Sequence, residues 1–248
     1  MPSPPATPSQ RLRFVQEQLT AAAERVGRDP SSVTLVGVSK GHPSSSIRAF
    51  VEAGLTDVGE SYLQEAEGKF GELTDLSFRR HFIGALQRNK VKRVLPLVDL
   101  LQSVDSVKLA REVVKRVRTF HGPDSPSTLP KPYPCMVQVN LAGEESKHGC
   151  FPALTSSVAE VLTDQSDGLV SCVGLMTIAP LSTMDDPVAQ RSFFNQMARH
   201  WSEVRDQFPE CVELSMGMSG SFPVAVEEGA TLVRVGSLLF GPRPISDP

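Results

Sequence analysis

Hydrophobic residues recur in two alternating patterns along the chain. Apolar residues between positions 12 and 26 fall at helical spacing, and this pattern stops at Gly27, a residue typical of a helix C-terminus. Residues 33–39 are then mostly apolar on both faces, as expected of a buried parallel strand, and they lead into a turn sequence at residues 40–43. The chain is therefore expected to begin with a helix that precedes the first strand of a sheet.

The same alternation of strands and helices continues along the chain. Further helices are predicted from Ser44 to Gly54 and over residues 87–95, 106–120, 152–162, 187–208 and 219–228. Strands are predicted at residues 33–39, 57–60, 81–86, 97–103, 135–140, 170–176, 212–216 and 231–235. A proline-rich loop over residues 121–134 interrupts the pattern once.

This order of elements predicts the fold class. Eight strands separated by helix-length segments favour a closed barrel over an open, doubly wound sheet. No GxGxxG motif follows the first strand, which argues against a dinucleotide-binding fold and leaves an open, flavodoxin-like sheet as the minor alternative. We expect an α/β protein that forms a single (β/α)8 TIM barrel with an extra N-terminal helix.

Length and composition fit one globular domain. A chain of 248 residues suits a single barrel, and its 40% hydrophobic and 21% charged residues are too apolar for intrinsic disorder. Residues 1–9 are rich in Pro and Ser and lack the regions of a secretory signal. We predict a flexible tail at residues 1–9 and a barrel domain over residues 10–248.

Charge and cysteine content exclude several classes of function. The formal net charge of -3 provides no cationic field that would attract nucleic acid or anionic lipid. No apolar run approaches the roughly 20 residues that span a bilayer, so no membrane segment is expected. The four cysteines include no CxxC pair and no zinc-like spacing with histidine. We expect reduced thiols, no metal site and a cytoplasmic location, with a mitochondrial pool left open.

The first candidate for chemistry is a lysine at the end of the first strand. Active groups of such barrels lie at the carboxyl ends of the strands, and Lys40 comes directly after seven mostly apolar residues. Nearby low-dielectric walls would lower its pKa towards a neutral, nucleophilic amine that can form an imine. A lysine that extends into solvent at the barrel rim is the alternative.

Two further signals lie near the end of the chain. Ser219 stands where a helix is predicted to begin, and Gly236 and Ser237 follow the last strand. Their amides match the phosphate site that barrels build from the loops after strands seven and eight, although an ordinary helix cap and turn are the alternative. A phosphate held there is expected to lie across the barrel mouth from the first strand.

Arg234 is a charged residue within an apolar strand. An unpaired guanidinium would be costly there, so it needs an acceptor, either a ring nitrogen of a ligand or a carboxylate such as Glu60. Because arginine stays protonated, it would donate to an unprotonated pyridine and weaken that ring as an electron sink.

Short motifs at these positions carry a family resemblance. The sequence resembles the pyridoxal phosphate homeostasis protein family, single-domain relatives of the alanine racemase N-terminal barrel. The matching motifs are VSK at residues 38–40, GESYLQE at 59–65, HFIGALQRNK at 81–90, SVDS at 103–106, VN at 139–140, GEESK at 143–147, GLM at 174–176, LSMGMS at 214–219 and VRVG at 233–236. Each motif is weak alone, but their common order and spacing make the resemblance specific.

The resemblance implies a fold-type III barrel that binds pyridoxal 5'-phosphate (PLP). Lys40 would be the Schiff-base lysine that holds PLP covalently, Arg234 would meet the pyridine nitrogen, and Ser219 with the Gly236 and Ser237 amides would bind the phosphate. The full set of expected cofactor-binding residues is Lys40, Ser61, Ser215, Met216, Ser219, Arg234, Gly236 and Ser237. No catalytic residue is assigned, because members of this family bind the cofactor without an established reaction of their own.

The resemblance also implies a cellular role. We expect a protein of intracellular PLP (vitamin B6) homeostasis, which buffers PLP or delivers it to apo PLP-dependent enzymes, and we expect a monomer. Two positions depart from the family pattern, because Ser61 replaces a usual Asn and Ser221 replaces a usual Asp. The shorter Ser61 side chain puts a contact from strand two in doubt, and Ser221 lacks a carboxylate at a helix start.

Other functions and residues remain as alternatives. A PLP-dependent amino-acid racemase of the related barrel class needs a second domain, and only residues 244–248 follow Arg243, so we expect no catalytic activity. A lysine-imine aldolase and a pure interaction module are also considered, the latter without a repeat, coiled coil or basic stripe to support it. His81 is expected to be structural at the lower end of the barrel, and Tyr62 to be a packing residue. Lys147 and His148 are expected to be solvated, with a second anion site as the alternative.

Overall fold

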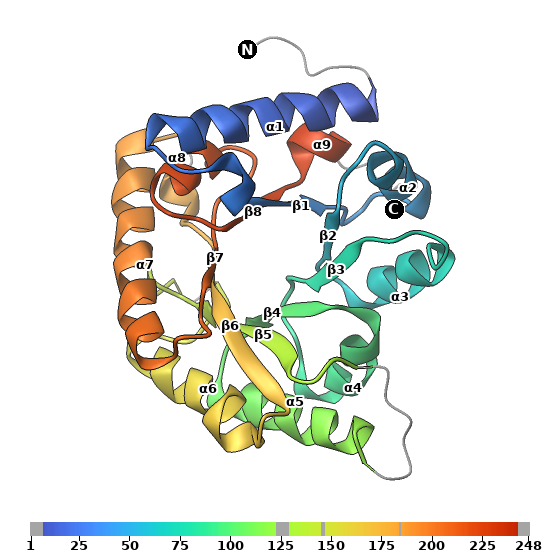
Figure 1. The fold of residues 1–248 in the computed structure, drawn as a ribbon, viewed down its shortest axis with the longest axis vertical. Helices are drawn as coiled ribbons and strands as arrows, with labels where there is room; N and C mark the ends of the chain where they lie inside the picture. The colour runs from blue at the N-terminus through green and yellow to red at the C-terminus, as the bar shows by residue number, and fades with distance from the viewer. Residues whose placement is uncertain (1–6, 123–128, 145–146, 184, 243–248) are drawn as a thin grey trace.

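The computed structural model describes residues 7–122, 129–144, 147–183 and 185–242. Eight parallel strands form a closed barrel in chain order, and β8 pairs with β1 to complete it (Figure 1). The strands are β1 (Thr34–Val38), β2 (Asp57–Glu60), β3 (Arg79–Phe82), β4 (Leu100–Val104), β5 (Tyr133–Val139), β6 (Val170–Thr177), β7 (Glu213–Ser215) and β8 (Leu232–Val235). The expected (β/α)8 barrel is confirmed, and β2 has the predicted bounds.

Helices surround the barrel on its outer side (Figure 1). They are α1 (Pro8–Arg25), α2 (Ser44–Glu52), α3 (Leu63–Glu72), α4 (Val91–Val94), α5 (Val107–Phe120), α6 (Thr155–Leu162), α7 (Pro187–Gln207), α8 (Phe222–Glu227) and α9 (Ser237–Phe240). The extra N-terminal helix α1 packs against α8 and α9. Helix α3 and the short helix α9 were not among the helices predicted from the sequence.

Helix α1 begins before the predicted end of the tail. Thr7 caps it, because its hydroxyl accepts from the Gln10 N–H while the Gln10 side chain accepts from the Thr7 N–H. Two otherwise unpaired backbone donors are thereby satisfied, with Pro8 in the first turn, where its missing N–H costs nothing. Pro8 and Ser9 therefore belong to the helix, and residues 1–6 of the predicted tail lie outside the described residues.

The largest boundary error concerns β3. The strand covers Arg79–Phe82 instead of residues 81–86, so His81 lies in its middle and does not open it. In the sequence, Arg79 and Arg80 at the start of the strand resembled a solvated cluster. Residues 83–86, which were predicted to be part of the strand, follow it. The helix predicted at residues 87–95 is present as α4 between two short 3-10 turns, Arg88–Lys90 and Leu95–Leu97, and β4 starts at Leu100 instead of residue 97.

The barrel interior has an apolar layer and a polar layer. Val36, Leu100, Met136 and Leu232 form a small cluster inside the barrel, separate from the large core between the strands and the helices. Buried polar side chains from β2, β3, β4, β7 and β8 occupy the rest of the interior, and they are Asp57, His81, Gln102, Ser215 and Arg234. Barrel interiors are usually filled by branched apolar residues, so the polar layer marks a site.

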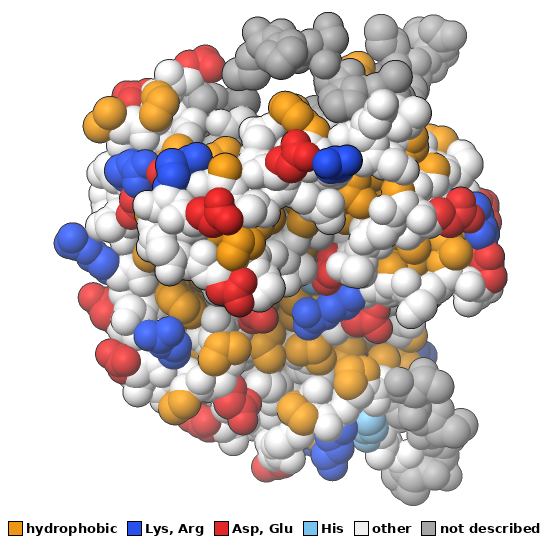
Figure 2. Space-filling model, turned by 45° about the horizontal axis from the view of Figure 1, so that its top comes forward, with side chains coloured by type: hydrophobic (Ala, Val, Ile, Leu, Met, Phe, Trp, Pro, Cys, Tyr) orange, Lys and Arg blue, Asp and Glu red, His pale blue; other side chains and the backbone are white. Residues whose placement is uncertain are grey.

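Two observations concern contacts with membranes and the distribution of charge. No helix among the described residues is long and apolar enough to cross a bilayer. Acidic and basic side chains are interspersed on the face shown in Figure 2, and no stripe of one sign runs across it.

Candidate functional site

Lys40 follows β1 at the carboxyl end of the barrel. The Ser39 hydroxyl points to the outer side, where it donates to Glu60 Oε1 at 2.6 Å. Alternation along β1 turns Val36 and Val38 to the inward face, and Lys40 lies in the turn that follows, in which the His42 N–H donates to the Ser39 carbonyl at 3.0 Å. Val36 is fully buried and Val38 is only half-buried, so the barrel opens to solvent on the side of Lys40.

A buried ionic cluster on the outer side anchors the turn after β1. Lys69 on α3 donates to the Ser39 carbonyl at 2.9 Å and lies 2.6 Å from Glu60 Oε1 and 2.5 Å from Glu65 Oε2. Glu65 also accepts from the Gly41 N–H at 2.7 Å. Gly41 has a φ of 79°, a left-handed conformation that favours glycine, so the turn and its anchor depend on each other.

Arg234 is buried inside the barrel and bonded to neutral groups. Its Nη1 donates to Ser215 Oγ at 2.6 Å and its Nη2 donates to the Thr177 carbonyl at 2.7 Å. Burial lowers its pKa to about 10, with no contribution from a nearby carboxylate. The alternative of an ion pair with Glu60 is therefore wrong, because Glu60 faces outwards and pairs with Lys69. A guanidinium has five N–H donors, so Arg234 can also serve a ligand.

Two of the three residues predicted to bind phosphate, Ser219 and Gly236, meet at the end of β8. The Gly236 N–H donates to Ser219 Oγ at 3.2 Å. Gly236 is also the N-cap residue of α9, and no side chain caps the start of that helix. Ser237 is exposed at the first position of that helix. The prediction that a helix starts at Ser219 is wrong. Helix α8 begins at Phe222, because the turn after β7 extends to Ser221, whose hydroxyl accepts from the Met218 N–H.

The position of this loop corrects one expectation. The segment after β8, with Gly236 and Ser237, was expected across the barrel mouth from the first strand. It lies beside that strand, because closure of the barrel makes β8 the neighbour of β1 (Figure 1). A Cβ added at Gly236 would lie 3.4 Å from the Val38 carbonyl oxygen, two residues before Lys40. Arg234 is in register with Val36 on the same pair of strands. Arg234 thus lies near the end of β8, and Gly236 and Lys40 follow the ends of the adjacent strands β8 and β1.

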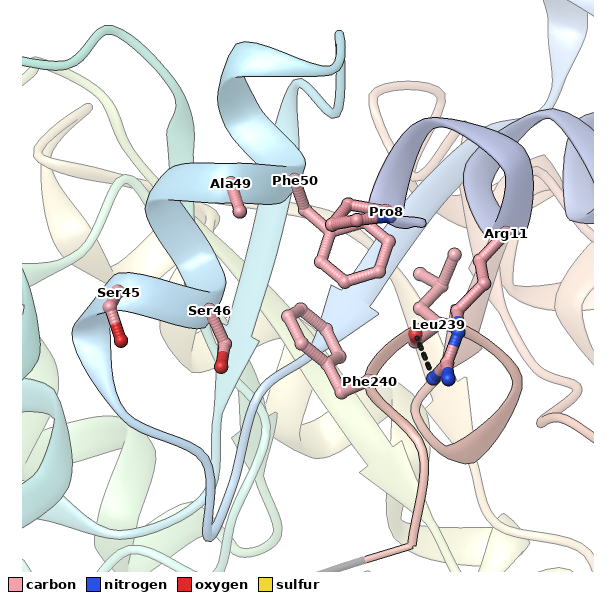
Figure 3. A pocket seen from close by; sticks show the side chains of 8 residues that line it. All are labelled: Pro8, Arg11, Ser45, Ser46, Ala49, Phe50, Leu239 and Phe240. Atoms are coloured by element: carbon pink, nitrogen blue, oxygen red, sulfur yellow. Dashed lines mark hydrogen bonds between the residues drawn. The ribbon is translucent and has the colours of Figure 1, made fainter. Parts of the chain in front are cut away.

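Helix α1 supports this loop from the outside. Figure 3 shows a groove between α1, α2 and α9, with a volume of about 270 Å³, in which the rings of Phe50 and Phe240 lie next to each other. Arg11 of α1 donates to the Leu239 carbonyl at 3.2 Å. The His42 ring, in the turn after Lys40, also contacts Phe240, with 5.5 Å between ring centroids. The groove therefore lies outside the barrel, among the helices that pack behind the loop after β8.

Ser215 is the last residue of β7, and Met216 follows it within the core. Both are fully buried, and the Ser215 hydroxyl donates to Gln102 Oε1 at 2.7 Å while it accepts from Arg234. Gln102 also lies 2.8 Å from His81 Nδ1, and His81 Nε2 lies 2.9 Å from Asp57 Oδ1. The buried His81 thus faces the barrel interior at the level of the site. Gln102 was missed in the sequence, where a polar residue inside an apolar strand was the available signal.

Comparisons with known proteins agree with this arrangement. The model of the alanine racemase N-terminal domain family matches residues 14–244. A pyridoxal phosphate homeostasis protein of Aquifex aeolicus is 38% identical over 235 residues, which cover 94% of this chain and 97% of that protein. The protein of the same name from Pseudomonas aeruginosa is 36% identical over 244 residues, which cover 98% and 99%. The chain belongs to the pyridoxal phosphate homeostasis protein family. The resemblance carried by the short motifs is confirmed.

Solved structures related to this family share the barrel. PipY of Synechococcus elongatus with PLP bound has a TM-score of 0.79 and 34% identity, and the match covers 95% of this chain and 100% of that one. Alanine racemase of Streptomyces lavendulae has a TM-score of 0.71 at 17% identity, with 95% of this chain matched to 60% of that one. The second likeness concerns the fold alone.

The two departures from the family pattern have different structural settings. Ser61 is half-buried after β2, and a Cβ added at Gly84 would lie 1.9 Å from its carbonyl oxygen. Its backbone is thus closely packed, whatever its side chain contacts. Ser221 is the N-cap of α8, and its hydroxyl closes the preceding turn by accepting from the Met218 N–H at 3.1 Å.

The remaining candidates have structural settings away from Arg234. Tyr62 is 54% exposed, so it is not the packing residue that was expected. Lys147 is not solvated either, because it donates to the Ala179 carbonyl at 2.6 Å and pairs with Glu144. His148 lies 3.9 Å from Asp105 with an exposed side chain.

The buried histidine predicts a pH dependence of stability. Burial holds the pKa of His81 below its ordinary value of 6.5, although Asp57 opposes this shift. The unfolded chain therefore takes up a proton first as the pH falls, and the free energy of unfolding should fall below about pH 6.5. Urea unfolding between pH 5 and 7.5 measures the slope. The variant His81→Asn should show a shallower slope, and an unchanged slope would contradict this expectation.

Proposed function

We propose that this chain binds PLP and holds it as an imine on Lys40, and that it acts in intracellular PLP homeostasis. The carrying observation is that Lys40 follows β1, Arg234 lies near the end of β8, and Gly236 after β8 is bonded to Ser219 of the loop after β7, so all four belong to the carboxyl ends of neighbouring strands. The PLP-bound PipY structure, at 34% identity, supports the same ligand for this chain.

Each group has a chemical role in this proposal. PLP supplies an aldehyde that condenses reversibly with an amine, and Lys40 supplies that amine at the mouth of the barrel. The Ser219 hydroxyl and the amides of Gly236 and Ser237 would bind the phosphate. The 3.2 Å bond between Gly236 and Ser219 is at the upper end of the normal range for an N–H donor, and a charge-assisted bond from the same N–H to phosphate would be the stronger of the two.

Arg234 would donate to the pyridine nitrogen. Its desolvated guanidinium remains protonated at neutral pH, so it favours an unprotonated ring and a weak electron sink. Such a site suits storage and transfer of the cofactor better than carbanion chemistry. Buffering, delivery to apo PLP-dependent enzymes, a monomeric state and a cytoplasmic location are parts of this proposal. The racemase alternative gains no support from neighbours that share only the fold.

Borohydride trapping tests the proposal. The chain is incubated with PLP, reduced with borohydride and mapped by peptide mass spectrometry, and the adduct is expected on Lys40. Lys40→Ala should lose this adduct together with the visible absorbance of the complex. Lys115→Ala, which changes an exposed lysine on α5, should keep both. An adduct that forms chiefly on other lysines of the wild type would refute the assignment.

A further inference from the structure

Five buried side chains form one line of hydrogen bonds across the barrel interior, from β2 to β8. The distances are 2.9 Å from Asp57 Oδ1 to His81 Nε2, 2.8 Å from His81 Nδ1 to Gln102 Nε2, 2.7 Å from Gln102 Oε1 to Ser215 Oγ, and 2.6 Å from Ser215 Oγ to Arg234 Nη1. Each of the five residues is at most 6% exposed. The line therefore joins a buried carboxylate to a buried guanidinium through three neutral side chains.

The hydrogen bonds of this line have one consistent direction. Arg234 can only donate, so Ser215 accepts from it and passes its own proton towards Gln102 Oε1. The Gln102 amide then presents its NH2 group to the His81 ring, and the ring nitrogen that faces it, Nδ1, has to accept.

The far end of the line has the matching polarity. Burial alone would raise the pKa of Asp57, but the hydrogen bonds from His81 and Thr56 outweigh burial and hold that pKa below its ordinary value. Asp57 is therefore an ionised acceptor for the His81 Nε2–H. Burial lowers the pKa of His81, so the ring is neutral and carries its single proton on Nε2. Every link thus has one donor and one acceptor.

We propose that Asp57, His81 and Gln102 are positioning residues that act through Ser215 to set the orientation of the Arg234 guanidinium towards the barrel mouth. The inference rests on the proposed PLP site, because Arg234 is the group expected at the pyridine nitrogen. A second anchor, the Thr177 carbonyl, holds Nη2 at 2.7 Å. The two anchors fix two nitrogens of a planar group, and this directs its remaining donors.

The physical reason lies in the cost of buried polar groups. Unpaired, each of these side chains would destabilise the barrel, whereas a fully satisfied line specifies one arrangement of the whole set. A change at Gln102 is therefore transmitted to the guanidinium through the Ser215 hydroxyl that both groups bind. The charged groups that act on the His81 ring are Asp57 on β2, Arg79 on its own strand and Asp99 before β4, while the neutral Gln102 faces it from β4.

Nitrogen NMR of the His81 ring tests the line without any ligand. In the wild type at pH 7 we expect a neutral ring with its proton on Nε2, because burial lowers its pKa below the ordinary value of 6.5. The variant Gln102→Glu places an acceptor opposite Nδ1, so the ring should take a second proton and titrate at a higher pH. A wild-type ring protonated on Nδ1 at pH 7 would overturn the inference.

PLP binding provides the second readout. We expect Gln102→Leu to weaken PLP affinity about tenfold, the equivalent of one charge-assisted hydrogen bond, and to alter the pH profile of the absorbance of the complex. The matched control is Gln190→Leu, which removes a buried glutamine on α7 that donates to the Thr183 carbonyl outside the barrel. This control should keep wild-type affinity and pH profile despite a similar loss of stability.

The outcomes separate this inference from the proposed function. If the wild type traps PLP on Lys40 while Gln102→Leu keeps its affinity and pH profile, the positioning role is refuted and the PLP site stands. If the wild type traps no PLP on Lys40, the proposed function is refuted and the positioning role falls with it. Equal losses in Gln102→Leu and Gln190→Leu would identify a general effect of stability and also refute the positioning role.

Discussion

Replacement of Lys69 by methionine is expected to lower the free energy of unfolding by about 3–5 kcal/mol, the cost of breaking a buried ion pair from one side. Lys69 and Glu60 are 9% and 0% exposed. The Lys69 ammonium pairs with Glu60 and Glu65 and donates to the Ser39 carbonyl. Methionine keeps the length of the side chain and removes only the charge and its hydrogen bonds. The carboxylate of Glu60 would remain buried without its cation.

The state of Glu60 explains why this loss is large. Burial raises its pKa above the ordinary value even though Lys69 and Ser39 donate to it, and its Oε2 is a buried atom without a hydrogen-bond partner in the described structure. Removal of the cation would raise this pKa further. The deficit of the variant should therefore be smallest below the ordinary pKa of 4.5 and should grow as the pH rises.

Urea unfolding of three variants measures this effect. The double variant Glu60→Gln with Lys69→Met should recover most of the loss, because it leaves no buried charge. Arg13→Met breaks a surface pair in which both side chains are more than 60% exposed, and it should change stability by less than about 1 kcal/mol. A loss below about 1 kcal/mol for Lys69→Met, or no recovery in the double variant, would contradict the expected role of the cluster.

Gly84→Ala is expected to destabilise the protein by about 3 kcal/mol or more, at the upper end of overpacking effects. A Cβ at this position would lie 1.9 Å from the Ser61 carbonyl oxygen and 2.6 Å from its carbonyl carbon. These are backbone atoms, so no change of rotamer relieves the clash and one of the two loops has to move. Because the clash lies between the loop of Gly84 and the loop that carries Ser61 after β2, PLP affinity should fall as well.

A second glycine provides the control for this substitution. Gly68 lies inside α3 with open space around the added Cβ, and alanine is the better helix former there. Gly68→Ala should therefore raise stability by about 0.5–1 kcal/mol. Thermal and urea unfolding of both variants give the comparison. If Gly84→Ala were as stable as the wild type, the close approach of the two loops would be wrong.

Much of the fold could be predicted from local patterns. The strand at Asp57–Glu60 has the predicted bounds, and the alternation of elements led to the closed barrel. The prediction failed at β3, where Arg79, Arg80 and His81 look polar in the sequence. Arg80 lies over the rings of Phe70 and Phe78, and the buried His81 lies between Asp57 and Gln102.

By itself, the sequence determined the barrel, the family and the positions of Lys40 and Arg234 at strand ends, because hydrophobic period and motif order are local properties. Only the tertiary structure decided that β8 lies beside β1, that Glu60 pairs with Lys69, and that Gln102 links His81 to Ser215. These contacts join residues far apart in the chain or select one partner among several candidates of the same type. Such choices depend on strand register, on barrel closure and on which face of each strand is turned inward, and these are set by packing of the whole domain.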